Sequence, residues 1–231
     1  MKNLAIYCIL LFFFGFQATA QNLNGAYIAK DKGLNHLLLV NDGYLTLSTY
    51  ADNAYKSSQG GTYQIQGDQL LVHWEFNDQE TKDIGNIQKI KFKKNQKSLS
   101  INNLDFKQQP SIKQELDGLW RITARKNAEQ ELQQLPNSDR KTIKLLIDGY
   151  FQWIAINPIE KTFHGTGGGS YIFKNGIYTE HIKFFSRDNS RIGATLSFNG
   201  EVNHLQWHHT GKSSKGAPIY EIWTKQKNKA E

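Results

Sequence analysis

The sequence predicts an all-β protein built from two tandem small antiparallel β-barrels. Short runs of alternating apolar and polar residues, separated by glycine-containing turns, recur at the regular spacing typical of barrels and sandwiches. The same landmarks also occur twice, in the same order, along the 231 residues. Only residues 127–135 have a composition typical of a helix, and a proline follows them. We expect that helix to be a short insertion in the second barrel.

The internal repeat divides the chain into two halves. The landmarks of the first half and their counterparts in the second are Leu23, Gly25 and Tyr27 with Leu116, Gly118 and Trp120; Asp42, Gly43 and Tyr44 with Asp148, Gly149 and Tyr150; Gly60, Gly61 and Tyr63 with Gly168, Gly169 and Tyr171; His73 and Gly85 with His181 and Gly193. Such a series indicates a duplication. We expect a first β-barrel-like repeat at residues 21–109 and a second barrel at 115–227.

The strands follow from their alternation and from the turns between them. The Asp-Gly pairs at 42–43 and 148–149 suit the positive φ angles of hairpin turns, and Asn-Gly at 175–176 marks a third hairpin. The glycine run at 165–169 lacks the Lys and Ser/Thr of a phosphate-binding loop, so we expect a flexible turn there. The predicted strands cover residues 36–40, 44–50, 69–76, 87–93, 97–101, 141–147, 150–156, 171–174, 177–185, 191–198, 202–209 and 218–225.

Closure of each meander into a barrel would remove the exposed strand edges that invite aggregation. A barrel of about eight strands has an interior that side chains fill or that holds one small ligand. The fold class therefore narrows the function to these two possibilities for each barrel.

Residues 1–20 have the pattern of a secretory signal peptide. Lys2 supplies a positive start, residues 4–16 are almost continuously apolar, and residues 18–20 form the small-x-small pattern that signal peptidase cuts. The single cysteine, Cys8, lies in this segment, so the mature chain would have neither a disulfide nor a thiol nucleophile. We expect an exported protein, periplasmic or secreted, that is held together by core burial alone.

The formal net charge of +7 makes the chain basic. The densest basic run, residues 89–97, alternates lysines with Ile90 and Phe92, which is typical of a strand with one solvated face. Because export argues against nucleic acid as a partner, we expect at most a weak contact with anionic surfaces of the cell envelope. The sequence leaves the oligomeric state open.

A group of motifs in the second half is characteristic of a known family. They are Leu116-x-Gly118-x-Trp120, Asp148-Gly149-Tyr150-Phe151, Gly168-Gly169-x-Tyr171, Tyr178-Thr179-Glu180-His181-Ile182 and Tyr220-Glu221-Ile222-Trp223. With them the second half resembles the lipocalin-like domain family of uncharacterised exported bacterial proteins. The first half resembles a diverged copy, since it has Val72 in place of Glu180 and lacks the Glu-Ile-Trp ending. The resemblance implies a small β-barrel with a ligand pocket, and it supplies no catalytic set.

Glu180 is the main candidate for a functional residue. Period-2 alternation places it on the same strand face as Tyr178 and Ile182, which we expect to point inward. A carboxylate there loses solvation unless it is paired, hydrogen-bonded or neutralised by a raised pKa. It could grip a ligand or transfer a proton, or it could be a structural residue bonded to Arg121 or to a tyrosine hydroxyl.

The last predicted strand supplies a second inward carboxylate, Glu221, on the face of Trp223. Because the first and last strands of a closed barrel are neighbours, Glu221 should lie near Trp120. Two inward carboxylates could form an acid/base pair of the kind that hydrolyses glycosides. The full set of candidate ligand-binding residues is Glu180, Arg121, Tyr178, Tyr171, Trp120, Glu221 and Trp223.

Histidines cluster at positions 204, 208 and 209, around Trp207. Two histidines four apart on a strand lie about 13 Å from each other, too far to bind one metal ion together. We therefore expect these to be surface histidines, and we predict neither a metal nor another cofactor.

Three functions remain open on the sequence alone. We favour an exported binding module whose second barrel holds a small apolar or amphipathic molecule, with Glu180 and Arg121 as its polar grip. The first alternative is an envelope structural or interaction protein with filled barrels. The second is a hydrolase or lyase that uses Glu180, which we rank below a binding role.

Overall fold

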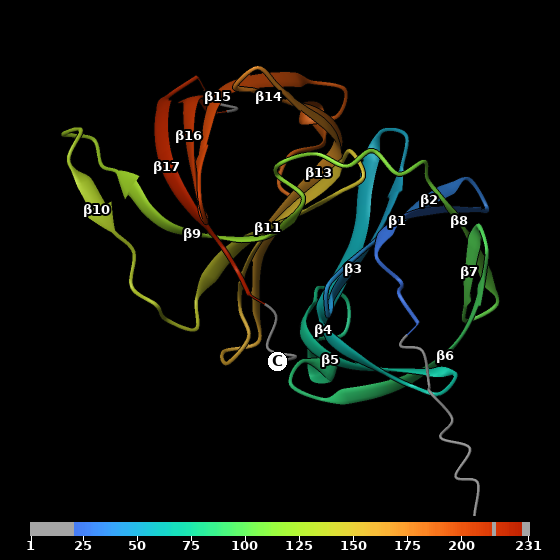
Figure 1. The fold of residues 1–231 in the computed structure, drawn as a ribbon. Helices are drawn as coiled ribbons and strands as arrows, with labels where there is room; N and C mark the ends of the chain where they lie inside the picture. The colour runs from blue at the N-terminus through green and yellow to red at the C-terminus, as the bar shows by residue number, and fades with distance from the viewer. Residues whose placement is uncertain (1–20, 214–215, 228–231) are drawn as a thin grey trace, which may run out of the picture.

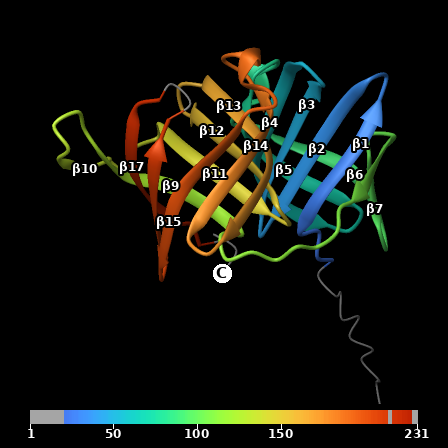
Figure 2. The same cartoon turned by 90° about the horizontal axis from the view of Figure 1, so that it is seen from above.

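The structure is a computed structural model that describes residues 21–213 and 216–227. The predicted signal peptide, residues 1–20, lies outside the described residues. Two antiparallel barrels of eight strands each stand side by side (Figure 1, Figure 2). The predicted all-β fold with tandem antiparallel barrels is confirmed. Among the described residues, no helix has the length and apolar character to cross a membrane.

The first barrel is a meander in which each strand pairs with the next, the up-and-down arrangement of lipocalins. It closes where β1 meets β8, with Tyr27 opposite Gln108. Its strands are β1 (Gly25–Asp31), β2 (Leu34–Asn41), β3 (Tyr44–Ala51), β4 (Ala54–Gln66), β5 (Gln69–Asn77), β6 (Ile87–Asn95), β7 (Ser98–Ile101) and β8 (Leu104–Gln108).

The second barrel repeats this arrangement and closes where β17 meets β9, with Lys225 opposite Trp120. A short additional strand, β10, extends from β9. The strands are β9 (Gly118–Lys126), β10 (Leu132–Gln134), β11 (Lys141–Ile147), β12 (Tyr150–Asn157), β13 (Thr162–Lys174), β14 (Ile177–Phe185), β15 (Thr195–Asn203), β16 (Gln206–Lys212) and β17 (Pro218–Lys225).

The prediction of a helical insertion at residues 127–135 is wrong. The Asn127 side chain accepts a hydrogen bond from the Glu131 backbone N–H at 2.9 Å, which closes a turn. The chain then returns along β9 as β10, with Leu132 opposite Lys126. All residues of β10 are exposed, so this segment has no buried apolar face of the kind that stabilises a short helix.

The predicted hairpin turns at the two Asp-Gly pairs are confirmed. Asp42 and Gly43 have φ angles of 40° and 79°, and Asp148 and Gly149 have 51° and 78°. Aspartate and glycine are among the residues that tolerate this left-handed region. The two turns fix the register of the hairpins β2–β3 and β11–β12, which face each other at the seam between the barrels.

The glycine run at residues 165–169, predicted to be a flexible turn, instead lies within β13. A Cβ on Gly169 would lie 2.0 Å from the His181 carbonyl oxygen, and one on Gly168 would lie 2.5 Å from the Phe184 ring. The strand register shifts between these two glycines, which marks a β-bulge. The glycines therefore allow β13 and β14 to approach closely, and Gly60 and Gly61 mark the same register shift in the first barrel.

Three apolar clusters hold the molecule together. One fills each barrel, and the third lies between the barrels, where the outer faces of their strands pack together. The buried members of this inter-barrel cluster are Ala26, Leu37, Leu39, Tyr44, Tyr50 and Phe76 from the first barrel and Ile143, Leu145, Ile147, Ile154, Ile156 and Phe184 from the second. The two barrels thus share one continuous apolar interface.

Polar contacts also cross this interface. The buried Gln152 side chain donates to the Thr166 hydroxyl at 2.9 Å and to the Ser58 hydroxyl at 3.3 Å. Ser58 and Thr166 occupy equivalent positions in the two repeats. At the rim, the Lys141 ammonium lies 2.8 Å from both carboxylate oxygens of Glu75. These contacts fix the orientation of one barrel on the other.

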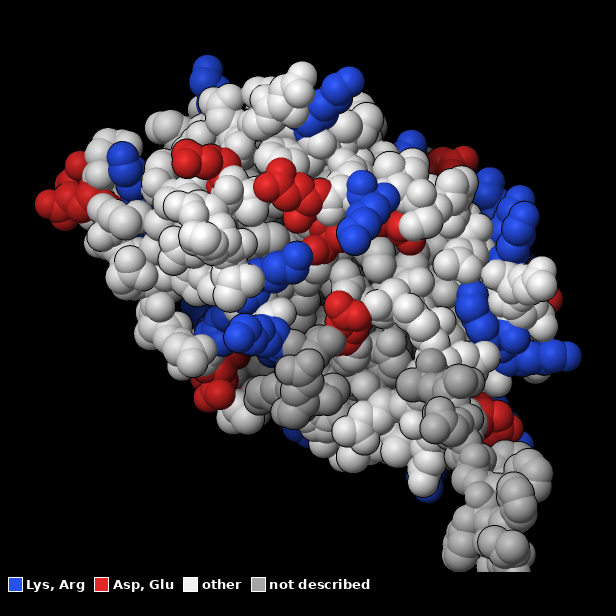
Figure 3. Space-filling model, in the orientation of Figure 1, with Lys and Arg blue, Asp and Glu red and all other residues white. Residues whose placement is uncertain are grey.

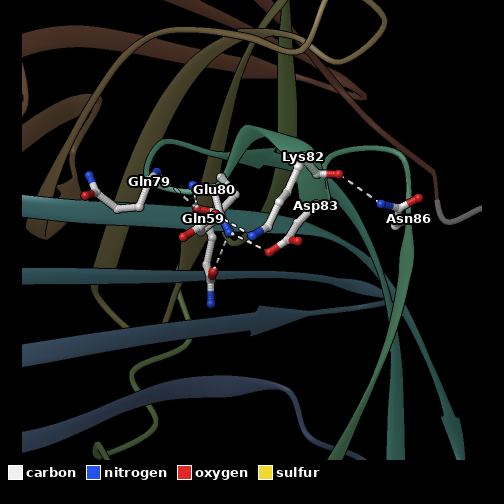
Figure 4. Close-up of polar contacts among 7 residues, drawn as sticks. Gln59, Gln79, Glu80, Lys82, Asp83 and Asn86 are labelled. Carbon is white, nitrogen blue, oxygen red and sulfur yellow. Dashed lines mark hydrogen bonds and ion pairs between the residues drawn. The ribbon is translucent and has the colours of Figure 1, made fainter.

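A loop with its own hydrogen bonds follows β5 in the first barrel (Figure 4). The Asn77 side chain accepts a bond from the Glu80 backbone N–H at 3.0 Å and donates to the Gln59 side chain at 3.1 Å. The 3-10 turn η1 (Thr81–Asp83) comes next, and η2 (Asn189–Arg191) has the equivalent place in the second barrel. The repeat therefore extends to the loops as well as the strands.

Candidate functional site

A buried ion pair lies inside the second barrel. The Lys144 ammonium, from β11, lies 2.9 Å from a carboxylate oxygen of Glu180, from β14. The two side chains are only 5% and 7% exposed. Lys144 faces inward because it alternates with Ile143 and Leu145, which face the other barrel. Glu180 thus points into the barrel, as the sequence predicted.

Aromatic rings surround the ammonium of Lys144. Its nitrogen lies 4.9 Å from the ring centre of Tyr178, 5.1 Å from those of Trp207 and Trp223, and 5.8 Å from that of Phe151. These distances are within the range of cation–π attraction, which strengthens when the cation is desolvated. We call Lys144, Glu180 and these four rings the lysine box.

A second acid lies beside the lysine box. One carboxylate oxygen of Glu221, on β17, lies 3.2 Å from Nδ1 of His209 and accepts a hydrogen bond from the Trp223 indole at 3.0 Å. His209, on β16, is buried, whereas Glu221 keeps 24% of its side chain exposed. The two carboxylates therefore have different partners, an ammonium for Glu180 and an imidazole for Glu221.

The charges of this second pair follow from burial and hydrogen bonding. Burial lowers the pKa of His209, although the bond to Glu221 opposes that shift. Burial would raise the pKa of Glu221, but the bond with His209 and the charge of Lys144 outweigh it, so this pKa lies below its usual value. At neutral pH the pair is a neutral imidazole that donates from Nδ1 to a carboxylate, which leaves Nε2 as an acceptor.

Two buried polar atoms next to the lysine box, the Trp207 indole nitrogen and Nε2 of His209, have no hydrogen-bond partner among the described residues. The Tyr178 hydroxyl lies beside them and hydrogen-bonds to Glu180. Their rings are mutual neighbours, with centres 4.9 Å apart for Tyr178 and Trp207 and 5.0 Å for Trp207 and His209. Burial, and then the charge and the hydrogen bond of Glu180, raise the pKa of Tyr178 well above its usual value, so its hydroxyl keeps its proton. The site therefore presents one donor, the Trp207 indole, and one acceptor, Nε2 of His209, that the protein itself does not use.

The structure brings together most, but not all, of the residues predicted for the site. Tyr178, Glu180 and Trp223 belong to the lysine box, and Glu221 lies beside it. Trp120 packs edge-on against Trp207, at 5.9 Å between ring centres. Tyr171 lies one strand over, opposite Glu180, but its hydroxyl donates to Asp117 at 2.6 Å.

Arg121, expected either to grip a ligand together with Glu180 or to bond to Glu180, lies away from that carboxylate. Its guanidinium donates to the Ser138 carbonyl oxygen at 2.6 Å in an exposed bond. Alternation on β9 explains the difference, because Trp120 points into the barrel and its neighbour must point out. Lys144 takes the position beside Glu180 that the sequence analysis gave to Arg121.

Two members of the site were missed. Lys144 was not recognised, although a lone lysine within Ile143-Lys-Leu-Leu-Ile147 is unusual in a strand buried on both faces. His209 was expected on the surface but is buried, because it shares the inward face of β16 with Trp207. That shared face was the available signal.

The first barrel shows what these positions contain when the site is absent. The strand registers match Lys144 to Leu38, Glu180 to Val72, Trp207 to Leu99, Trp223 to Phe106, His209 to Ile101 and Glu221 to Leu104. All six residues of the first barrel belong to or pack against its apolar core. The same closed fold thus forms without any of the charged groups.

Two surface hollows lie away from the lysine box. One, of about 500 Å³, has a largely apolar lining that includes Ile112, Tyr150, Ile172 and His181. The other, of about 350 Å³, is lined by both barrels and includes Asp42 and Lys225, among others. Neither is lined by Lys144 or Glu180. Within residues 21–213 and 216–227, no three His, Cys, Asp or Glu side chains are arranged to hold a metal ion.

The fold and this interior define a protein of two lipocalin-like barrels with apolar cores, the second of which also encloses a buried ion pair. A lipocalin-like protein from Bacteroides uniformis ATCC 8492 is similar in structure, with 14% sequence identity and a TM-score of 0.35. The similarity covers 48% of this chain and 98% of that protein. No protein-family model matches the chain, and a search of curated proteins finds no match. The barrel architecture described above follows from the strand pairing of this chain itself.

Proposed function

We propose that this is an exported lipocalin-like binding protein whose second barrel takes a small amphipathic molecule. The observation that carries the proposal is the difference between the two barrels. Removing two charges from water costs several kcal/mol per ion, and apolar residues of similar size often stabilise a core as well or better. Since the first barrel closes with apolar residues at these positions, folding alone does not account for Lys144 and Glu180.

The unused polar atoms define the chemistry of the ligand. The Trp207 indole can donate, and Nε2 of His209 can accept. A ligand that satisfies them has a polar group with both an acceptor and a donor, such as a hydroxyl or an amide. The surrounding rings suit an apolar remainder.

Entry of a ligand requires Lys144 to give up part of the space it fills. Its ammonium occupies the centre of the box, and its flexible four-carbon stem allows that group to withdraw while Glu180 accepts a bond from the ligand. In this proposal Lys144 holds the box in shape until a ligand replaces it.

The proposal of export rests on the sequence of residues 1–20, which has a charged start, an apolar run and a small-x-small cleavage pattern. Fractionation of cells that express the full chain, with N-terminal sequencing of the product, tests it. We expect a mature protein that begins near Gln21 outside the cytoplasm. A full-length product in the cytoplasm would contradict the proposal.

Native mass spectrometry tests the binding proposal. The purified protein is incubated with a small-molecule extract of the expressing cells and compared with the double variant Lys144→Leu/Glu180→Val, which gives the second barrel the residues of the first. We expect the wild type to retain a molecule that the double variant loses. The proposal fails if both proteins retain the same molecules, or if neither retains any while both are folded.

A second function is favoured by one specific observation. Large side chains, including Trp120, Trp207, Tyr171, Tyr178 and Phe151, are fully buried in the second barrel. A solid barrel of this kind suits a structural or interaction protein of the envelope. The same experiment separates the two functions, because a solid barrel retains no small molecule in either form.

A further inference from the structure

The outer wall of the first barrel carries a row of unpaired lysines. On β6, Lys89, Lys91 and Lys93 are exposed, whereas the alternating Ile90 and Phe92 are buried in the barrel core. Outward side chains on a strand follow one another at about 6.8 Å, so the three ammonium groups form one straight line. In Figure 3, Lys and Arg side chains gather at the edge of the molecule where Figure 1 places β6 to β8.

Few opposite charges face this row. The cross-strand neighbours of Lys89, Lys91 and Lys93 are Leu71, Gln69 and Ser100, which are all uncharged. The acidic residues at its margins are Asp68, in the turn before β5, Asp83, in the loop before β6, and Asp105 on β8, which accepts a hydrogen bond from Ser100. None of the ion pairs among the described residues involves the three lysines. Lys97 and Lys107, both exposed, add to the positive charge.

An apolar residue begins the same outward row. Ile87 is 66% exposed and precedes Lys89 at the spacing that keeps it on the outer face of β6. Clustered lysines are attracted to anionic lipid surfaces, and an exposed apolar side chain beside them can enter the headgroup region. A soluble polyanion offers no apolar region for the isoleucine side chain to enter, so the combination of lysines and Ile87 favours a lipid surface.

We propose that this face, formed by Ile87, Lys89, Lys91 and Lys93, docks the protein onto an anionic lipid surface. The lysines meet the lipid phosphates, and Ile87 enters the headgroup region. The face belongs to the first barrel, whereas the proposed ligand site lies inside the second. A failure of the docking proposal would therefore leave the ligand-binding proposal unaffected, and the reverse is also true.

Co-sedimentation with lipid vesicles tests the proposal. The purified protein is mixed with vesicles of phosphatidylcholine alone or of phosphatidylcholine with phosphatidylglycerol, at low and high salt. We compare it with Lys89→Gln/Lys91→Gln/Lys93→Gln. A matched control, Lys30→Gln/Lys56→Gln/Lys161→Gln, removes the same charge from exposed lysines elsewhere. Circular dichroism verifies that all three proteins are folded.

We expect the wild type to bind the anionic vesicles and to lose binding as salt rises. Each lysine near an anionic surface contributes to the binding affinity, so the loss of all three should weaken binding by about two orders of magnitude. The matched control should bind nearly as well as the wild type. Ile87→Ser should weaken binding further without changing the salt dependence.

Three results would overturn the proposal. The first is that the wild type binds both kinds of vesicle equally. The second is that the two triple variants lose affinity to the same extent, which would make net charge rather than this face responsible. The third is that dextran sulfate, a soluble polyanion, binds through the three lysines while anionic vesicles do not.

Discussion

Replacement of Glu180 by valine, alone and together with Lys144→Leu, measures what the buried pair costs the fold. In Glu180→Val the Lys144 ammonium loses its only carboxylate at 2.9 Å and stays in a box that is nearly closed to water. Breaking a buried pair in this way costs about 3–5 kcal/mol. The double variant reproduces Leu38 and Val72 of the first barrel, and apolar replacement of a buried pair ranges from neutral to about 4 kcal/mol of stabilisation.

Urea unfolding followed by tryptophan fluorescence is the assay. Four of the five tryptophans, Trp120, Trp153, Trp207 and Trp223, lie in the second barrel, so the signal reports mainly on that barrel. We expect the single variant to unfold at much lower urea than the wild type, and the double variant at equal or higher urea. If the double variant is as unstable as the single one, the pair is a structural necessity, and the comparison of the barrels no longer indicates a function.

Three further predictions concern the pH dependence, the interface and the bulge. Because the folded state lowers the pKa of His209, the unfolded state binds the extra proton, so the free energy of unfolding should fall below about pH 6.5 by up to about 1.4 kcal/mol per pH unit. Thermal unfolding of His209→Asn should show a shallower loss of stability with falling pH, and an identical slope would contradict this prediction. The lowered pKa of His36 affects both proteins alike. Leu39→Ala, in the first barrel but within the inter-barrel cluster, should cost about 2–5 kcal/mol and shift the tryptophan signal of the second barrel, whereas an unshifted signal would mean that the barrels unfold independently. Gly169→Ala should lower the stability of the fold by about 3 kcal/mol or more because its Cβ meets the His181 carbonyl oxygen. Gly67→Ala, in open space at a φ of 61°, is the control and should lower the stability by about 1–2 kcal/mol, as measured by thermal unfolding.

The architecture was predictable because its signals are local and repeated. The Asp-Gly turns at 42–43 and 148–149 determine hairpins whatever the rest of the chain does, and strand alternation around Glu180 gives its direction. By contrast, the helix predicted at residues 127–135 rested on composition alone. Pairing of β10 with the edge of β9 outweighs that weak propensity.

The partners in the site could not be predicted because they come from strands far apart in the sequence. Lys144 and Glu180 are 36 residues apart and meet only when β11 and β14 lie on opposite sides of a closed interior. The charge of Arg121 favoured it as the partner, although the inward orientation of its neighbour Trp120 requires Arg121 to point outward. The glycine run at 165–169 was misassigned for a related reason, since the neighbour that requires it, β14, is visible only in the folded sheet.

The apolar cluster between the barrels changes the meaning of the short connection at residues 109–117. The halves adhere through Leu37, Leu39, Leu145 and their neighbours, with the amide of Gln152 bridging two equivalent hydroxyls. That connection therefore serves mainly to fix a one-to-one stoichiometry of the two halves and to raise their effective concentration for each other during folding. We expect a protease cut within it to leave two fragments that still migrate as one particle, because the inter-barrel cluster does not depend on the connection.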